Sequence, residues 1–335
     1  MPVLIDSSYV PPKHFTNKHI QTVFPTIFRK VPEISYERER VELDDGDFID
    51  LDWARKSGKR LAIILHGMES NSSQNYVKGM AHAFNNRNWD AVILNLRSCS
   101  GEINRLYKSY HSGFTEDLES IIRHIVYNNK FLEISVVGFS LGGNIVLKFA
   151  GEKGSNTPPI IKKFAAISVP CDLGAVAEKM KTEHRFYMKR FIRSFKKKLR
   201  AKRGLFPNAL TSSKIRSIKD FKNLDDLYTA PANGYKNAED YWEQNSSKKY
   251  IANIKTPTLL INALDDPFLP KEAFPIVQAN NNKFFFFETP EYGGHVGFIL
   301  RASKMYWHEL RVINFIIDGD LEGKNMVDVI KKAES

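Results

Sequence analysis

Short apolar runs rich in β-branched and aromatic residues recur along the chain, and stretches with helical spacing separate several of them. The runs, each short enough for one strand, cover residues 48–53, 61–65, 91–96, 134–137, 164–169, 258–262 and 284–287. Apolar positions follow a helical repeat over residues 75–84, 115–127, 141–150 and 303–317. This alternation predicts an α/β fold with a mostly parallel central sheet flanked by helices.

Three segments depart from the alternation. Residues 1–34 show no clear periodicity, and the turn-rich link at residues 44–47 predicts an antiparallel hairpin at the sheet edge. Residues 171–255 are Lys-rich and mostly helical in pattern, and the strand and helix alternation resumes only after them. We therefore expect a core formed by residues 1–170 and 256–335, with a helical cap insertion formed by residues 171–255.

The positive charge of the chain is concentrated in one part of this insertion. The formal net charge is +11, and residues 181–203 alone hold eleven Lys or Arg and one acid. The rest of the chain is close to neutral, which is unlike the broad basic face of a nucleic-acid binder. Apolar residues at 187, 188, 191, 192, 195 and 199 predict an amphipathic helix. Two interpretations stay open: peripheral contact with an anionic membrane through residues 181–203, or a helix packed on the core with a solvated basic face.

Composition narrows the cellular setting and the chemistry. The chain has two cysteines, Cys99 and Cys171, no signal-peptide pattern and no apolar run long enough to span a bilayer. These features favour a cytoplasmic protein, with membrane-peripheral contact left open. The sequence has no His-Glu-x-x-His or paired-cysteine metal motif and no nucleotide-binding loop, so we expect no metal and no cofactor.

The most informative motif is Gly138-Phe139-Ser140-Leu141-Gly142, which follows an apolar strand and precedes a helix. That context is typical of a nucleophile elbow, in which a sharp turn exposes the serine and its neighbours must be small. The helix after the serine favours developing negative charge at its first turn. Ser140 is therefore the candidate nucleophile.

A second strand, residues 61–65, ends in His66-Gly67-Met68. In enzymes with a nucleophile elbow, one oxyanion donor follows such an early strand and the other follows the nucleophile. The backbone N–H groups of Met68 and Leu141 are the candidates for this oxyanion hole. His66 either shapes this loop near the substrate or is a core histidine at the end of the strand.

The acid and the base of a catalytic triad should follow the serine in that order. Asp265 and Asp266 come directly after a late strand, and the loop pattern before Pro267 favours Asp266 over its neighbour. His295 lies in a loop with glycines on both sides, so it is the candidate general base. His308, the other histidine after the two aspartates, lies in a helical pattern and is interpreted as structural.

Several motifs together resemble the YheT-like hydrolases, a group of α/β-hydrolase fold enzymes. The likeness covers nearly the whole chain, and its motifs lie at residues 17–22, 66–69, 97–102, 104–105, 109–113, 136–144, 225–231, 241–242 and 262–268. Eukaryotic members of the wider group are abhydrolase-domain esterases and phospholipases that act on acylglycerols and phospholipids. The resemblance implies the triad Ser140, Asp266 and His295 and the hydrolysis of carboxylic esters, either short-chain esters or acylglycerol-type lipids.

The segment at residues 97–113 follows the strand at residues 91–96, at the edge of the sheet where ligands bind in α/β folds. Arg105, Tyr110 and His111 are candidates to line the substrate pocket. The alternative is a structural loop whose polar side chains bond its own backbone.

Three functions are compatible with these residues. The first is a serine esterase or lipase with a small-molecule ester or lipid substrate. The second is thioester or carbon–carbon bond hydrolysis on the same triad, because one fold supports several chemistries. The third is a non-catalytic lipid-binding or partner-binding protein, against which the complete set of triad residues argues.

Overall fold

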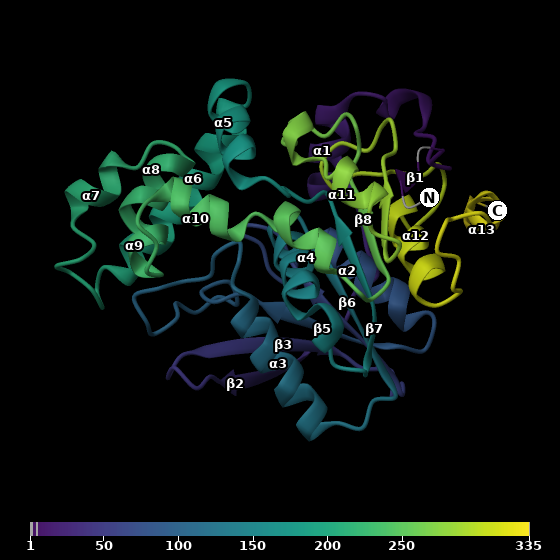
Figure 1. Cartoon of the computed structure of the whole chain (residues 1–335), viewed down its shortest axis with the longest axis horizontal. Coiled ribbons are helices and arrows are strands. Elements are labelled where there is room, and N and C mark those ends of the chain that lie inside the picture. The colour runs from purple at the N-terminus through teal and green to yellow at the C-terminus, as the bar shows by residue number, and fades with distance from the viewer. Residues whose placement is uncertain (1–2, 5, 335) are drawn as a thin grey trace.

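The computed structural model describes residues 3–4 and 6–334 and shows a sheet with helices on both faces (Figure 1). The strands are β1 (Val3–Leu4), β2 (Glu37–Glu42), β3 (Phe48–Ala54), β4 (Arg60–Leu65), β5 (Asp90–Asn95), β6 (Glu133–Phe139), β7 (Ile161–Ile167), β8 (Thr258–Ile261) and β9 (Phe285–Glu288). They pair in the order β1-β9-β8-β7-β6-β4-β5-β3-β2. The β2–β3 and β3–β5 pairs are antiparallel and the others are parallel, which confirms the predicted sheet and its edge hairpin.

The helices match the predicted repeats and add segments that the sequence pattern did not indicate. The α-helices are α1 (Lys18–Phe28), α2 (Asn75–Asn85), α3 (Thr115–Asn128), α4 (Leu141–Lys153), α5 (Leu173–Thr182), α6 (Arg185–Lys202), α7 (Ser212–Ser217), α8 (Phe221–Leu224), α9 (Ala230–Ala232), α10 (Ala238–Asn245), α11 (Ile276–Asn280), α12 (Trp307–Ile316) and α13 (Met326–Glu334). Helix α1 lies in the segment without clear periodicity, and α12 begins four residues later than the predicted start at 303.

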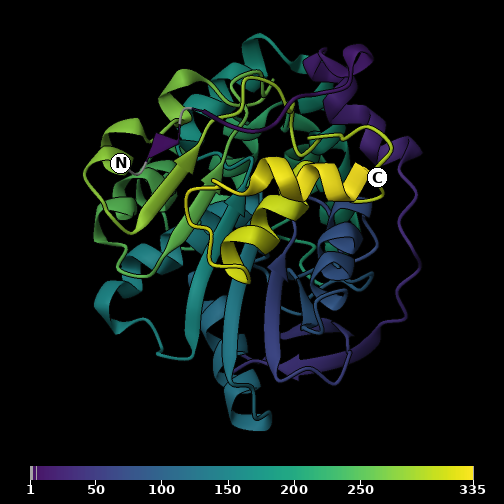
Figure 2. The same cartoon turned by 90° about the vertical axis from the view of Figure 1, so that its right-hand side faces the viewer.

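Successive residues of the central strands are buried on opposite faces of the sheet. On β4, Ile63 packs into the apolar layer beneath α3 and α4, whereas Ile64 packs into the layer beneath α2 and α12. Figure 2 shows the two C-terminal helices, α12 and α13, lying across the second face. Burial on both faces explains why these strands appear in the sequence as continuous apolar runs.

Helices α5 to α10 lie between β7 and β8 in the chain and form a group at one side of the sheet (Figure 1). They have an apolar cluster of their own, which includes Met188, Ile192 and Leu224 and also takes in Phe268 from the core. We propose that they act as a cap over the carboxyl ends of the strands. The two cysteines, Cys99 and Cys171, are both buried and free.

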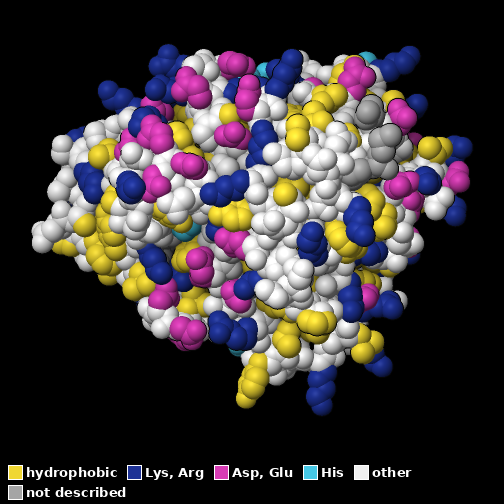
Figure 3. Space-filling model, viewed as in Figure 1, with side chains coloured by type: hydrophobic (Ala, Val, Ile, Leu, Met, Phe, Trp, Pro, Cys, Tyr) yellow, Lys and Arg dark blue, Asp and Glu magenta, His cyan; other side chains and the backbone are white. Residues whose placement is uncertain are grey.

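Charged side chains of both signs mix on the face that Figure 3 shows, with Asp and Glu lying between the Lys and Arg. Within the described ranges, no helix is long and apolar enough to cross a membrane.

Candidate active site

Ser140 lies at the turn between the end of β6 and the start of α4. Its backbone angles are φ 52° and ψ −119°, a sparsely populated conformation of the kind that costs about 1–3 kcal/mol. A Cβ atom at Gly138 would lie 2.5 Å from the carbonyl oxygen of Gly142, and one at Gly142 would lie 2.5 Å from that of His66. The backbone therefore passes so close to the serine that only glycine fits at either position.

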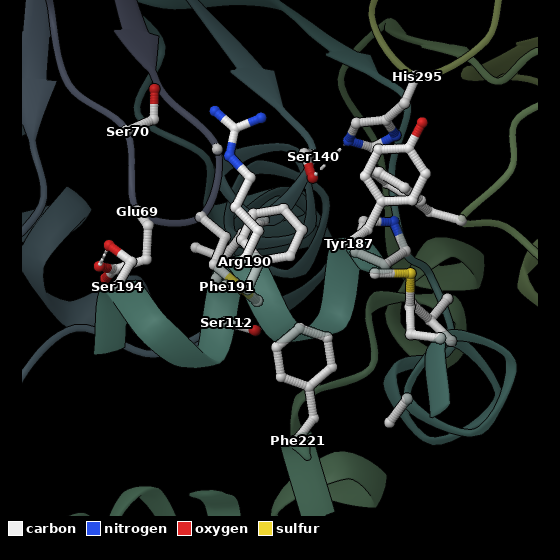
Figure 4. Close-up of a pocket in the computed structure, with 18 of the residues that line it drawn as sticks. Glu69, Ser70, Ser112, Ser140, Tyr187, Arg190, Phe191, Ser194, Phe221 and His295 are labelled. Carbon is white, nitrogen blue, oxygen red and sulfur yellow. Dashed lines mark hydrogen bonds between the residues drawn. The ribbon is translucent and has the colours of Figure 1, made fainter. Parts of the chain in front are cut away.

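The structure places His295 between Ser140 and Asp266. The Nε2 atom of His295 lies 3.0 Å from the Ser140 hydroxyl oxygen, and its Nδ1 lies 2.8 Å from Oδ2 of Asp266 (Figure 4 shows the first contact). Asp266 is 2% exposed, and its other carboxylate oxygen accepts a hydrogen bond from the Phe268 amide at 2.8 Å. These contacts fix the carboxylate and hold the imidazole with one nitrogen facing the serine.

Asp265 makes a different contact, although it is the direct neighbour of Asp266. Its carboxylate accepts a hydrogen bond from the backbone N–H of Gly294 at 2.8 Å and so holds the loop rather than the ring of His295. Burial is the main cause that raises the pKa of Asp265 to about 6. Of the two aspartates that the sequence left open, Asp266 is the one that contacts the histidine.

Helix α1 holds the histidine loop from the other side. The Thr22 hydroxyl accepts a hydrogen bond from the His295 amide at 2.9 Å. A Cβ atom at Gly294, where φ is 55°, would lie 2.6 Å from the Lys18 carbonyl oxygen. No role for α1 was predicted from the sequence, although Asn17, whose side chain caps the helix, and the motif at residues 17–22 were available signals.

The predicted oxyanion loop lies beside the serine. A Cβ atom at Gly67 would come within 3.2 Å of the Cβ of Ser140, and both Met68 and Leu141 line the cavity. Leu141 is the first residue of α4, so its N–H has no acceptor within the helix. Both residues that are predicted to supply the donor amides therefore lie on the wall that contains the serine.

Glu69, the residue after Met68, joins this loop to α6. Its backbone has φ 53°, and its carboxylate accepts hydrogen bonds from the Tyr110 hydroxyl at 2.8 Å and the Ser194 hydroxyl at 2.5 Å. The Nζ of Lys198 lies 2.9 Å from the same carboxylate, whose side chain is 3% exposed. The Tyr110 hydroxyl also accepts from the Glu69 amide, at 2.9 Å. This role of Glu69 was not predicted from the sequence.

The predicted substrate-binding residues separate into two groups. Tyr110 and His111 line the cavity. The His111 ring stacks on Phe114, and its Nδ1 accepts a hydrogen bond from the Gly113 amide.

His66 does not line the cavity. Its ring is fully buried and accepts a hydrogen bond from the Leu96 amide, and burial lowers the pKa of His66 to about 4. The prediction for Arg105 is also wrong, because its half-exposed guanidinium pairs with Glu42 outside the cavity.

The cavity beside Ser140 has a volume of about 360 Å³. Its wall combines the predicted oxyanion loop, the loops that contain Phe268 and His295, and α1 with side chains from the inserted helices. The apolar part includes Met180, Phe191, Phe195, Phe221, Leu224 and Phe268. Phe268 packs directly on the His295 ring, with centroids 4.4 Å apart, so the apolar wall extends to His295. In the described part of the chain, no three His, Cys, Asp or Glu side chains are grouped in a way that could hold a metal ion.

Comparison with known proteins places this chain in a family. Residues 62–302 match the family model described as alpha/beta hydrolase fold. The chain is 33% identical to the YheT protein of Escherichia coli (strain K12), over 92% of this chain and 93% of that protein. It is 26% identical to phospholipase ABHD3 of Mus musculus, over 88% and 74% of the two chains. The solved structure of the Pyrococcus furiosus esterase PF2001 is similar in fold, with a TM-score of 0.54, 16% identity, and coverage of 90% of this chain and 92% of that one. The chain belongs to the alpha/beta-hydrolase family and, within it, to the YheT-like hydrolases.

Proposed function

We propose that the protein is a serine hydrolase that cleaves carboxylic esters through an acyl-enzyme intermediate. The observation that carries the proposal is the continuous set of contacts from Asp266 through His295 to Ser140 at the wall of a largely apolar cavity. A nucleophile, a base within hydrogen-bond reach and a third group that orients the base are the arrangement that covalent hydrolysis requires.

In the first half of the reaction, the Ser140 oxygen attacks the ester carbonyl carbon, and His295 Nε2 takes the hydroxyl proton. Asp266 stabilises the imidazolium through Nδ1. The carbonyl oxygen becomes an oxyanion that the amides of Met68 and Leu141 stabilise, each by about 3 kcal/mol. The tetrahedral intermediate collapses, the bond to the alcohol oxygen breaks, and that oxygen takes the proton from His295.

In the second half, water attacks the acyl-serine ester. His295 takes a proton from the water, the same amides stabilise the second oxyanion, and the proton returns to Ser140 as the carboxylic acid leaves. One base thus serves both halves, because it is neutral again after each alcohol or acid has left.

The cavity is better suited to bind an acyl group than a purely polar substrate. Side chains from α5, α6 and α8 supply the apolar wall, and such a surface binds an acyl chain by burying it from water. Short-chain esters, acylglycerols and phospholipids all fit this description, and the relative ABHD3, which is named a phospholipase, is consistent with the lipid members of that set.

Two measurements test the proposal. A fluorophosphonate probe should label the parent protein. Prior incubation with an ester that the protein cleaves should slow this labelling. A panel of 4-nitrophenyl esters from acetate to palmitate, with monoacylglycerols and an acyl thioester, should show turnover that is higher for oxygen esters than for the thioester. No labelling and no turnover would instead support a non-catalytic binding protein.

A further inference from the structure

Arg190 of α6 contributes a cationic side chain to the wall of the cavity that contains Ser140. Figure 4 shows its guanidinium on the same side of the cavity as Ser70, pointing away from Phe221. The residue is exposed, so its charge is hydrated at the mouth rather than buried in the apolar part.

The acids of the cavity wall do not neutralise this cation. Among residues 3–4 and 6–334, no carboxylate lies within 4.0 Å of Arg190. Glu69 is already paired with Lys198 and bonded to Tyr110 and Ser194. Asp225 is buried and accepts a hydrogen bond from the Trp242 indole at 2.8 Å, and burial raises its pKa to about 7. Arg190 is thus a cation of the cavity wall that forms no ion pair with any carboxylate in the described part of the chain.

Neighbouring contacts hold this part of α6 against the triad. The Tyr187 ring, one turn before Arg190, packs edge-on against Phe268 with centroids 4.9 Å apart. Phe268 in turn packs on His295. Phe191, the residue after Arg190, also contacts Phe268 and points its ring into the apolar part of the cavity. The helix therefore presents an apolar ring and a guanidinium side by side next to the reacting serine.

The cavity wall near α6 has both polar and apolar groups. Ser70 lies on the side toward which the Arg190 guanidinium points (Figure 4), whereas α5, α8 and Phe268 supply apolar groups to the wall. An ester whose acyl chain lies among the apolar groups would direct its alcohol portion toward the polar side. A guanidinium there can donate two parallel hydrogen bonds to a phosphate or a carboxylate.

We infer that Arg190 forms a subsite for an anionic group, a phosphate or a carboxylate, on the alcohol side of the ester. The inference rests on the proposed function, because ester hydrolysis is part of that proposal. It narrows the substrate class to amphiphilic esters that carry a negative charge near the cleaved bond.

The test compares matched anionic and neutral substrates. The first pair is 1-octanoylglycerol 3-phosphate with 1-octanoylglycerol, and the second is 4-(octanoyloxy)benzoate with phenyl octanoate. For each pair, kcat/KM for the anionic ester is divided by kcat/KM for the neutral one. The proteins are the parent, Arg190→Gln and the control Arg193→Gln, which removes the same charge from an exposed position of α6 that does not line the cavity.

Arg190→Gln should lower the ratio by about tenfold in at least one pair, the size expected of one charge-assisted hydrogen bond that stays open to water. Arg193→Gln should leave the ratio unchanged. The pair with the larger loss identifies phosphate or carboxylate as the preferred group. An equal ratio in the parent and Arg190→Gln, or an equal loss in both variants, would overturn the subsite.

A binding measurement separates this inference from the proposed function. Calorimetric titration with decyl phosphate should give a Kd that Arg190→Gln raises by about tenfold and Arg193→Gln does not. A parent that cleaves none of the four esters but shows this difference in Kd would contradict ester hydrolysis and still support the anion subsite. Equal Kd values in the parent and Arg190→Gln would overturn the subsite whatever the activity.

Discussion

The carboxylate of Glu69 and the ammonium of Lys198 lie 2.9 Å apart and join the predicted oxyanion loop to helix α6. Because Glu69 directly follows Met68, this contact links the predicted oxyanion donor to the inserted helices. The link gives the basic helix a part in the site that its charge pattern alone did not indicate.

Lys198→Met should therefore lower kcat toward a small neutral ester by about tenfold, because it leaves the buried Glu69 carboxylate without its cation and frees the Met68 amide to move. Steady-state kinetics on 4-nitrophenyl butyrate would measure the effect. Lys197→Met, an exposed neighbour, is the matched control. Equal kcat values for the two variants would show that the contact does not position the loop.

Asp266→Asn should cost far more activity than Asp265→Asn. Losing the acid that holds the histidine tautomer costs on the order of 10⁴-fold in kcat. Asp265 contacts only the loop backbone through Gly294, so its replacement should have a smaller effect. Both variants can be measured on one chromogenic ester, and a larger loss for Asp265→Asn would reverse the assignment.

Asp225→Asn should change how stability depends on pH. Burial is the main cause that raises the pKa of Asp225 to about 7, and the nearby Asp226 adds to it. A carboxyl with a raised folded-state pKa stabilises the fold when protonated, and this contribution is lost as pH rises from about 4 to 7. The Tm of Asp225→Asn minus that of the parent should therefore increase by a few degrees between pH 5 and pH 8. A constant difference would mean that Asp225 does not titrate in this range.

We propose that the outer face of α6 contacts anionic membranes. Lys189, Lys197 and Arg200 are exposed on α6, and Phe186 on the same helix is 80% exposed. Each basic residue near an anionic surface contributes about 1 kcal/mol. Replacing the three basic residues by Gln should reduce sedimentation with phosphatidylserine vesicles at low salt, and 1 M NaCl should reduce the difference, because the Debye length falls to about 3 Å. Equal sedimentation at low salt would indicate a solvated helix face.

The sequence predicted the sheet because its central strands are buried on both faces and appear as continuous apolar runs. The sequence did not predict α1, because the contacts of this helix with the His295 loop join residues that lie far apart in the chain. The wrong prediction for Arg105 has the same origin, since Arg105 lies in a loop and its partner Glu42 lies far away in the chain, at the end of β2. The basic helix was predicted as a repeat. However, the periodicity could not show that Lys198 and Lys202 turn inward, where Lys202 donates to the carbonyl oxygens of loop residues 106–108.

Site residues with a local signature were the easiest to find. Ser140 and His295 each follow a strand and are flanked by glycines, and the structure places them 3.0 Å apart. Glu69 and Arg190 carry no such local signature. Their positions depend on how α6 packs against the core, which only the three-dimensional structure shows.

Mapping a fluorophosphonate adduct by mass spectrometry tests the central claim most directly. We expect one adduct on Ser140 in the parent, its loss together with ester turnover in Ser140→Ala, and an unchanged Tm for that variant. An adduct on another residue, or ester turnover by Ser140→Ala at the rate of the parent, would contradict that claim.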